Sequence, residues 1–192
     1  MDIVTRVILL MTLLVALSLG IRMATGKVRY SNLFDTKGMT FERTILVSLL
    51  GPLLAFEIVY PEFMPEIIYF HLFNWINQLG AVLVLIASLL RIWSQATLKS
   101  QWSEDLSLDK EHSLITTGPY RIVRHPMYAS YFPAAIGFLL ATSNLLIGTL
   151  AILYLGVSFL RIPAEESFLL SAFGNKYRQY QIETPRRIFP GF

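Results

Sequence analysis

Polar and potentially reactive side chains gather in two stretches of an otherwise apolar chain. The first runs from His112 to Tyr128 and contains two histidines, two arginines and two tyrosines. The second runs from Arg161 to Glu166 and brings an arginine and two neighbouring carboxylates. These side-chain types can bind ions of either sign and can transfer protons. Such a cluster is hard to explain as a solvated loop alone, so we take it as the candidate functional site.

The segment between the two stretches predicts how they meet. From Met127 to Leu160 the chain runs for 34 residues without a charged side chain, whereas one membrane span needs about 20 residues. The polar triplet at 142–144 interrupts this run near its middle. We therefore expect a hairpin of two short membrane helices. A hairpin returns its ends to one side, which should bring 161–166 close to His125 and Tyr128.

The rest of the chain predicts further membrane helices. Hydrophobic residues make up 54% of the sequence and charged residues 15%, compared with about 25% charged in soluble domains. Apolar runs at 7–21, at 44–60 with a kink at Gly51-Pro52, and at 67–90, continuing past Arg91 to about Leu98, predict three spans. A signal peptide is the alternative for the first of them.

Beyond the hairpin, Arg161-Ile162-Pro163 should end the membrane segment. Residues 164–182 then carry apolar side chains at helical spacing and predict one amphipathic helix at the interface. The predicted fold is thus an all-α polytopic integral membrane protein with about five transmembrane segments, a C-terminal helical hairpin and an amphipathic C-terminal helix. We expect one domain over 1–192, with three N-terminal helices in 1–98 and the catalytic region in 99–192.

Charge predicts the orientation. The segments 22–43, 99–124 and 176–187 hold five, four and four Lys or Arg residues, whereas 57–66 holds three Glu and neither Lys nor Arg. Because basic loops stay in the cytoplasm, the N-terminus should lie outside, and the C-terminus and the candidate site should face the cytoplasm.

Composition also excludes some classes of site. The chain has no cysteine, and its three histidines lie far apart, so we expect no metal site. The net charge of +3 is small and fits cytoplasmic loops better than nucleic-acid binding.

The order of the motifs resembles a known family. A Gly-Pro-Tyr turn at 118–120, an Arg-His-Pro-x-Tyr motif at 124–128, Arg161 with Glu165-Glu166, and Phe-Gly-x-x-Tyr-x-x-Tyr at 173–180 are similar to the isoprenylcysteine carboxyl methyltransferases. The wider membrane phospholipid methyltransferase group shares much of this pattern. The resemblance covers roughly 112–190. One departure is Ala129-Ser130, where relatives usually have a glycine.

The resemblance implies a pocket for S-adenosyl-L-methionine, with S-adenosyl-L-homocysteine as the product, built from the loop and the hairpin ends. The adenosine side would be lined by His112, Ser113, Leu114 and Ile115. The methionine part would be surrounded by Tyr120, His125, Pro126, Met127 and Tyr128. Glu165, together with Glu166, would hold the ammonium or the ribose, and Arg161 would face the substrate carboxylate as the catalytic and substrate-binding residue.

The chemistry fits these roles. A carboxylate acceptor is ionised at neutral pH and needs no general base, so the enzyme must desolvate it and aim it at the methyl group. The resemblance therefore implies methylation of the α-carboxylate of a prenylated cysteine or similar lipophilic carboxylate that enters from the bilayer, with membrane lipids as the other partners.

Alternatives remain open at this stage. They are a phospholipid (ethanolamine) N-methyltransferase, which would need a base, a sterol-reductase-like oxidoreductase, and a non-catalytic membrane scaffold. Single residues also have plain explanations. Arg121 and Arg124 fit cytoplasmic anchors, Arg91 fits a residue whose charged head reaches the membrane surface, and Glu57 fits the outer interface.

Overall fold

The computed structural model describes residues 2–10, 12, 49–60, 63, 65–98 and 113–189. These residues are helical or irregular, and the strand-like pairing among them is an isolated bridge between Tyr69 and Asn144. Several predicted segments lie outside the described residues. They are most of the first span at 7–21, the whole loop at 22–43, and the part of the 99–124 loop before residue 113.

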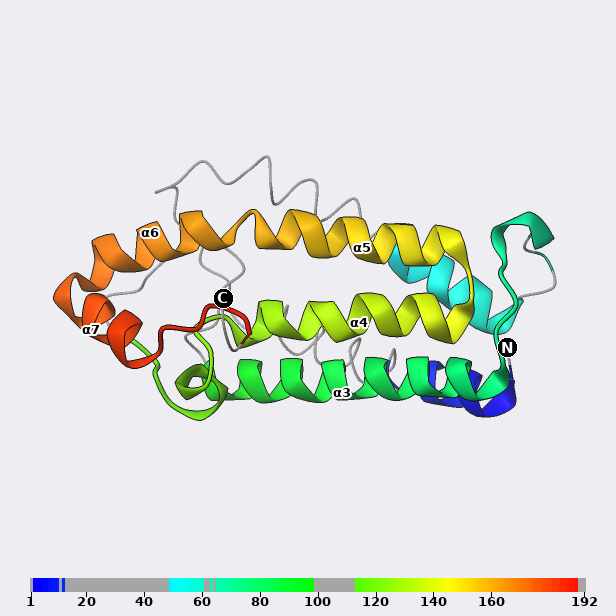
Figure 1. The fold of residues 1–192 in the computed structure, drawn as a ribbon, viewed down its shortest axis with the longest axis horizontal. Helices are drawn as coiled ribbons and strands as arrows, with labels where there is room; N and C mark the ends of the chain where they lie inside the picture. Colours follow the sequence, from blue (N-terminus) through cyan, green and yellow to red (C-terminus); the bar gives the residue numbers. More distant parts are fainter. Residues whose placement is uncertain are drawn as a thin grey trace.

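Three helices run side by side along the molecule (Figure 1). They are α3 (Asn74–Leu98), α4 (Pro126–Thr142) and α5 (Leu145–Phe159). The chain reverses between α4 and α5 at Ser143, whose φ of 53° is left-handed, and Asn144 then caps α5 by accepting from the amides of Leu146 and Ile147 at 3.0 and 3.3 Å. The structure thus forms a helical hairpin with its break at 142–144, as the sequence predicts.

The helix predicted to start at residue 67 starts at Asn74 instead. A short 3₁₀ turn, η2 (Glu66–Ile68), precedes it, and Tyr69 is extended. The amide of Phe70 donates to the carbonyl of Ser143 at 3.0 Å, so these apolar residues pair with the hairpin turn rather than join the helix. α3 does continue past Arg91 to Leu98, as predicted.

The C-terminal region differs from the predicted single amphipathic helix. α6 (Ile162–Phe173) continues the direction of α5 after a turn at Leu160 and Arg161 (Figure 1). Pro163 is tolerated because it lies in the first turn of α6, where no helical amide bond is lost. Gly174, with φ 54° and ψ −123°, then separates α6 from α7 (Asn175–Glu183). Residues other than glycine rarely adopt this backbone conformation, and the helix ends where it occurs.

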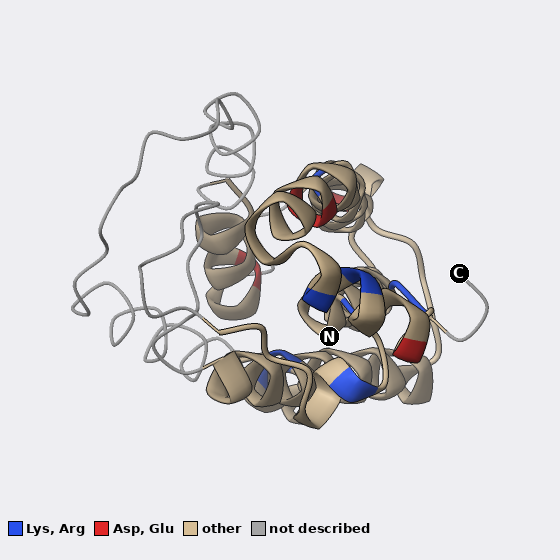
Figure 2. Ribbon diagram, turned by 90° about the vertical axis from the view of Figure 1, so that its left-hand side faces the viewer, with Lys and Arg blue, Asp and Glu red and all other residues tan. Residues whose placement is uncertain are grey.

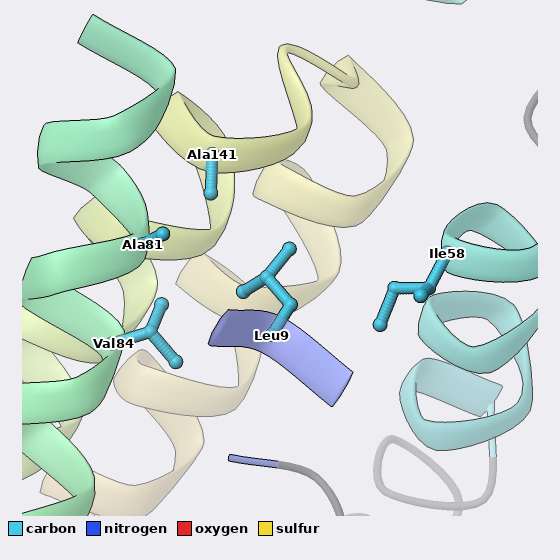
Figure 3. Packing of buried hydrophobic residues seen from close by; sticks show 5 residues of the cluster. All are labelled: Leu9, Ile58, Ala81, Val84 and Ala141. Atoms are coloured by element: carbon cyan, nitrogen blue, oxygen red, sulfur yellow. The ribbon is translucent and has the colours of Figure 1, made fainter. Parts of the chain in front are cut away.

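α3 and α4 pack with their backbones in close approach. A Cβ atom on Gly80 would lie 2.8 Å from the carbonyl oxygen of Gly137, and a Cβ atom on Gly137 would lie 2.8 Å from the carbonyl of Gly80. Beside this contact, Ala81, Val84 and Ala141 form a buried cluster with Leu9 from the helix of residues 3–10 and Ile58 from the helix Leu49–Val59 (Figure 3). Small residues therefore set the spacing of the two helices.

A polar cluster fixes the end of the bundle that holds the hairpin turn. Glu57 is only 1% exposed, and it accepts hydrogen bonds from Tyr69 Oη at 2.7 and 2.9 Å and from Asn144 Nδ2 at 3.1 Å. Asn77 of α3 donates to Ser143 Oγ at 2.6 Å. The sequence analysis placed Glu57 at the outer interface, and the structure buries it against the hairpin turn.

Two segments among the described residues are long and apolar enough to cross a membrane. They are Asn74–Leu98, with 25 residues, and Leu145–Phe173, with 29 residues. At about 1.5 Å per residue, 25 helical residues reach about 37 Å, which exceeds the bilayer core of about 30 Å. Length and composition thus support the predicted membrane protein.

Candidate functional site

The two polar stretches of the sequence lie at one end of the bundle. The 3₁₀ turn η4 (Gly118–Arg121), the start of α4, the start of α6, helix α7 and the segment 184–189 all gather there (Figure 1). Figure 2 views the molecule from this end and shows how few positions of the described ribbon are charged. The predicted approach of 161–166 to His125 and Tyr128 is confirmed by the contacts below.

Glu166 is the centre of a buried ion-pair network. Its Oε1 accepts from Nε and Nη2 of Arg124, both at 2.9 Å, and lies 3.3 Å from Nε2 of His125. Its Oε2 pairs with Nη2 of Arg187 at 2.9 Å. Glu166, Arg124 and His125 are 6%, 8% and 3% exposed. A buried carboxylate is stable only when it is paired in this way.

Glu165 is the more open of the two carboxylates. Its side chain is 26% exposed, and its Oε2 accepts a hydrogen bond from Tyr128 Oη at 2.8 Å. Its Oε1 lies 3.9 Å from Nδ1 of His125. Because a carboxylate offers about four acceptor sites, Glu165 keeps the capacity to bind a cationic group from outside the protein.

η4 and α7 hold each other in place. Gly118 enters η4 with a φ of 61°, as the predicted Gly-Pro turn requires. Tyr180 Oη donates to the carbonyl of Tyr120 at 2.6 Å, and the rings of Tyr177 and Tyr180 lie 6.0 Å apart. The tyrosine spacing of the 173–180 motif therefore anchors the turn that carries Tyr120.

Burial governs the tyrosine hydroxyls of this region. Burial raises the pKa of Tyr120 well above its usual range, and the nearby negative charge of Glu165 raises that pKa further. Burial likewise raises the pKa of Tyr177, and the charge of Glu166 adds to it. Both hydroxyls stay protonated. Within the described part of the chain, Tyr120 Oη is buried without a hydrogen-bond partner.

Two arginines lie beside an aromatic wall next to this network. Tyr128, Tyr131 and Ile162 form a buried cluster, in which the two tyrosine rings meet edge to face at 5.9 Å. Arg161 is 4% exposed and immediately precedes Ile162. Arg91 donates to Tyr131 Oη at 2.7 Å, and its guanidinium carbon lies 5.2 Å from the centre of that ring.

Sequence reasoning missed Arg91 as a site residue. Instead of reaching the membrane surface, its side chain turns into the bundle toward Tyr131. A signal for this existed in the sequence, because polar or small residues recur every three or four positions along α3 and mark its inward face. These residues are Asn77, Gly80, Ala81, Ala87, Arg91, Ser94 and Gln95, and the buried Val84 lies on the same face. Arg124, explained from sequence as a cytoplasmic anchor, is likewise buried.

The remaining predicted cofactor residues divide into three groups. His112 lies outside the described residues. Ser113 is exposed, Leu114 and Ile115 are partly exposed, and all three lead into η4 without regular structure. Pro126 is buried at the first position of α4, and Met127 beside it is partly exposed. The structure thus brings Tyr120, His125 and Tyr128 together with Glu165 and Glu166.

Comparisons with known proteins all point to one family. A model of the isoprenylcysteine carboxyl methyltransferase family matches residues 80–171. Protein-S-isoprenylcysteine O-methyltransferase B of Arabidopsis thaliana is 29% identical over 139 residues, which cover 69% of this chain and 70% of that protein. The protein-S-isoprenylcysteine O-methyltransferase of Schizosaccharomyces pombe is 40% identical over 81 residues, which cover 42% of this chain but only 34% of that protein.

A solved structure agrees in fold. The eukaryotic intramembrane Ras methyltransferase, named as isoprenylcysteine carboxyl methyltransferase, superposes with a TM-score of 0.54 at 22% identity. The match covers 84% of this chain and 54% of the solved chain. Residues 80–171 of this chain, which hold Arg91, Arg124, His125, Tyr128, Arg161, Glu165 and Glu166, thus match the model of the isoprenylcysteine carboxyl methyltransferase family.

Proposed function

We propose that this chain is a membrane methyltransferase that uses S-adenosyl-L-methionine to methylate the α-carboxylate of a prenylated cysteine or a similar lipophilic carboxylate. One arrangement carries the proposal. An open carboxylate, Glu165, accepts a hydrogen bond from Tyr128, Arg91 donates one to Tyr131, and Arg161 is close enough to Tyr128 to act on it electrostatically. The same tyrosine cluster therefore has one group suited to a cationic ligand and two suited to an anionic ligand beside it.

The cofactor fits groups that the protein leaves available. Glu165 has acceptor capacity and is 26% exposed, which suits the ammonium of the methionine part. Tyr120 Oη lacks a partner within the described residues and is close enough to Glu165 to sense its charge. We assign both to the cofactor, together with the ring of Tyr128, which can face a sulfonium. When bound, the cofactor supplies an electrophilic methyl group.

Glu166 and His125 have another role in this proposal. The oxygens of Glu166 already accept from Arg124, His125 and Arg187, so a ligand would have to displace one of these bonds. We infer that Glu166 positions His125 and the start of α4, while Glu165 makes the contact with the cofactor. The residues at 112–115 and Met127 would cover the adenosine and the methionine chain at the edge of the site.

The acceptor side follows from the arginines. A carboxylate acceptor attacks the methyl carbon with an oxygen lone pair, and the carbon–sulfur bond breaks as the carbon–oxygen bond forms. The products are a methyl ester and S-adenosyl-L-homocysteine, and no proton moves. Arg161 and Arg91 hold the carboxylate and aim it, because a guanidinium can bind both oxygens at once. Burial beside tyrosines keeps water away from the reacting oxygen.

The membrane explains how the acceptor arrives. We propose five membrane segments, with the N-terminus outside and with the site and the C-terminus in the cytoplasm. The site lies at the end of the apolar helices, where a lipid tail can remain in the bilayer while its polar head reaches Arg161. Membrane lipids surround the apolar faces of α3 and α5, which carry exposed Leu and Ile side chains.

A methyl-transfer assay tests the proposal. Purified protein in lipid is offered N-acetyl-farnesylcysteine or phosphatidylethanolamine with radiolabelled S-adenosyl-L-methionine. We expect an ester product from the first acceptor and no labelled product from the second. Arg161→Lys keeps the charge but loses the planar fork, so kcat/KM for the prenylcysteine should fall about tenfold or more, while cofactor affinity stays within about twofold.

Two results would count against carboxyl methylation. One is labelled phospholipid, formed at a rate that climbs with pH as an ammonium loses its proton, in a protein indifferent to Arg161→Lys. That outcome would favour amine methylation. The other is no transfer to either acceptor by protein that binds the cofactor, which would leave the acceptor class wrong.

A further inference from the structure

The segment 184–189 is held against the site by hydrogen bonds, an ion pair and apolar contacts. We call this segment, from Thr184 to Phe189, the C-terminal strap. The amide of Arg124 donates to the carbonyl of Arg186 at 2.9 Å, and the amide of His125 donates to the carbonyl of Arg187 at 2.8 Å. The strap thus pairs with the two residues that immediately precede α4, instead of hanging from the end of α7.

Buried side chains hold the strap as well. Nη1 of Arg124 donates to the carbonyls of Thr184 and Pro185 at 2.8 and 2.7 Å, while Nε and Nη2 of the same guanidinium bind Glu166. Arg187 adds its own pair to Glu166 at 2.9 Å. One arginine therefore ties the strap to α6, and the position of the strap is fixed by bonds to the centre of the network.

The last described part of the strap is apolar and touches the acceptor side. Ile188 packs against the cluster of Tyr128, Tyr131 and Ile162. The ring of Phe189 meets the ring of Phe132 edge to face at 5.2 Å. Phe132 projects from α4, is 42% exposed, and follows Tyr131, whose hydroxyl receives the hydrogen bond from Arg91. The strap therefore runs from the ion pairs to the apolar edge of the aromatic wall.

We propose that Ile188 and Phe189 of the C-terminal strap are specificity-determining residues that contact the apolar chain of the acceptor where it enters the site. This rests on the proposed function and adds a recognition surface to it. A carboxylate held by Arg91 or Arg161 beside Tyr131 leaves the rest of the molecule near Ile188 and the pair of Phe132 and Phe189. The hydrogen bonds to the carbonyls of 184–187 and the Arg187–Glu166 ion pair hold these two side chains in place. A surface fixed in this way can discriminate acceptors by the length of their apolar chain.

The test compares acceptors of two lengths. Kinetic constants are measured with N-acetyl-farnesylcysteine and N-acetyl-geranylgeranylcysteine for the unmodified protein and for Ile188→Ala and Phe189→Ala. Truncation removes part of the apolar contact, so KM for at least one acceptor should rise about threefold to tenfold, and the kcat/KM ratio between the two acceptors should change by a similar factor. The KM for S-adenosyl-L-methionine should stay within about twofold. The matched control is Phe73→Ala. Phe73 is 74% exposed and immediately precedes α3, at the end of the bundle away from the site, so its substitution should change neither the KM values nor the kcat/KM ratio.

A labelling experiment tests the contact without requiring turnover. A farnesylcysteine with a diazirine in its chain is irradiated with the protein in lipid, and the labelled peptide is mapped. Label at 184–189 or on Phe132, suppressed by excess unlabelled farnesylcysteine, supports the strap.

The results separate the two proposals. An active protein whose acceptor ratio is unchanged in both variants, or whose label lies on other segments, would overturn the role of the strap. If the KM values for both cofactor and acceptors rise in step, the strap is only structural, which also overturns it. Competitive label on the strap in a protein that forms no ester would keep the inference and refute the proposed reaction. Neither label nor ester would refute both.

Discussion

Two neighbouring glutamates should respond in opposite ways to the same substitution. Glu166→Gln replaces a carboxylate that is 6% exposed and bonded to Arg124, His125 and Arg187. Glu165→Gln replaces one whose side chain is 26% exposed and that accepts from Tyr128. Glutamine has nearly the shape of glutamate, so each change removes a charge and adds little steric strain. The pair separates folding from ligand binding.

The structure sets the size of the Glu166 effect. Without the carboxylate, the guanidinium of Arg124 remains 8% exposed and loses its anionic partner. Breaking a buried pair from one side costs about 3–5 kcal/mol, and we take about 3 kcal/mol because the amide oxygen still accepts. For a chain of this size, the unfolding temperature should fall by about 6–12 °C. Glu165→Gln should cost less than about 1 kcal/mol, since its hydrogen bond from Tyr128 can persist on the amide oxygen.

The assay is thermal unfolding in detergent, paired with calorimetric titration of S-adenosyl-L-methionine. Glu165→Gln should unfold within about 3 °C of the unmodified protein but bind the cofactor about tenfold to a hundredfold more weakly. Adding Arg124→Gln to Glu166→Gln should cost less than the sum of the single changes by about 1–3 kcal/mol, because the partners share one network. The reasoning fails if Glu166→Gln unfolds like the unmodified protein, or if Glu165→Gln is the more damaging to stability.

Two further predictions test the fold and its orientation. Gly80→Ala should lower the free energy of unfolding by at least about 1–3 kcal/mol, since the new Cβ would meet the backbone of α4. Gly156→Ala, whose new Cβ would have nothing within 4 Å, is the control and should be neutral or stabilising in the same unfolding measurement. Equal effects of the two substitutions would refute the close packing of α3 and α4. Because the chain has no cysteine, single cysteines at Lys176 and Glu66 can be tested with a membrane-impermeant maleimide, and the first should react only from the cytoplasmic side and the second only from outside. Reaction of both from one side would contradict the proposed topology.

The hairpin was predictable because it depends on local composition. A run of 34 uncharged residues is too long for one span, and Thr142, Ser143 and Asn144 can satisfy the backbone groups that a reversal leaves open. Once the hairpin is fixed, chain geometry brings Arg161, Glu165 and His125 to one end. The motif spacing that indicated a methyltransferase followed from the same segments, and the family comparison agrees with it.

The boundaries of the outer helices were not predictable in the same way. Residues 67–73 are apolar enough to continue a span, but Tyr69 and Phe70 use their hydrogen-bonding groups on Glu57, Asn144 and Ser143. Those partners lie far away in the sequence, so local hydropathy cannot predict these hydrogen bonds. Gly174 was visible in the sequence, yet its ability to end α6 depends on whether the packing of α7 selects its positive φ.

The sequence by itself determined the apolar helices, the hairpin and the end of the bundle that holds the polar residues. Only the tertiary structure decided which polar residue does what there. Glu165 and Glu166 are adjacent and chemically identical, but neighbouring residues of a helix point about 100° apart, so one stays open while the other is enclosed by Arg124, His125 and Arg187. The spacing of polar and small residues along α3 marks its inward face, but Arg91 meets Tyr131 only because of how α4 packs against that face.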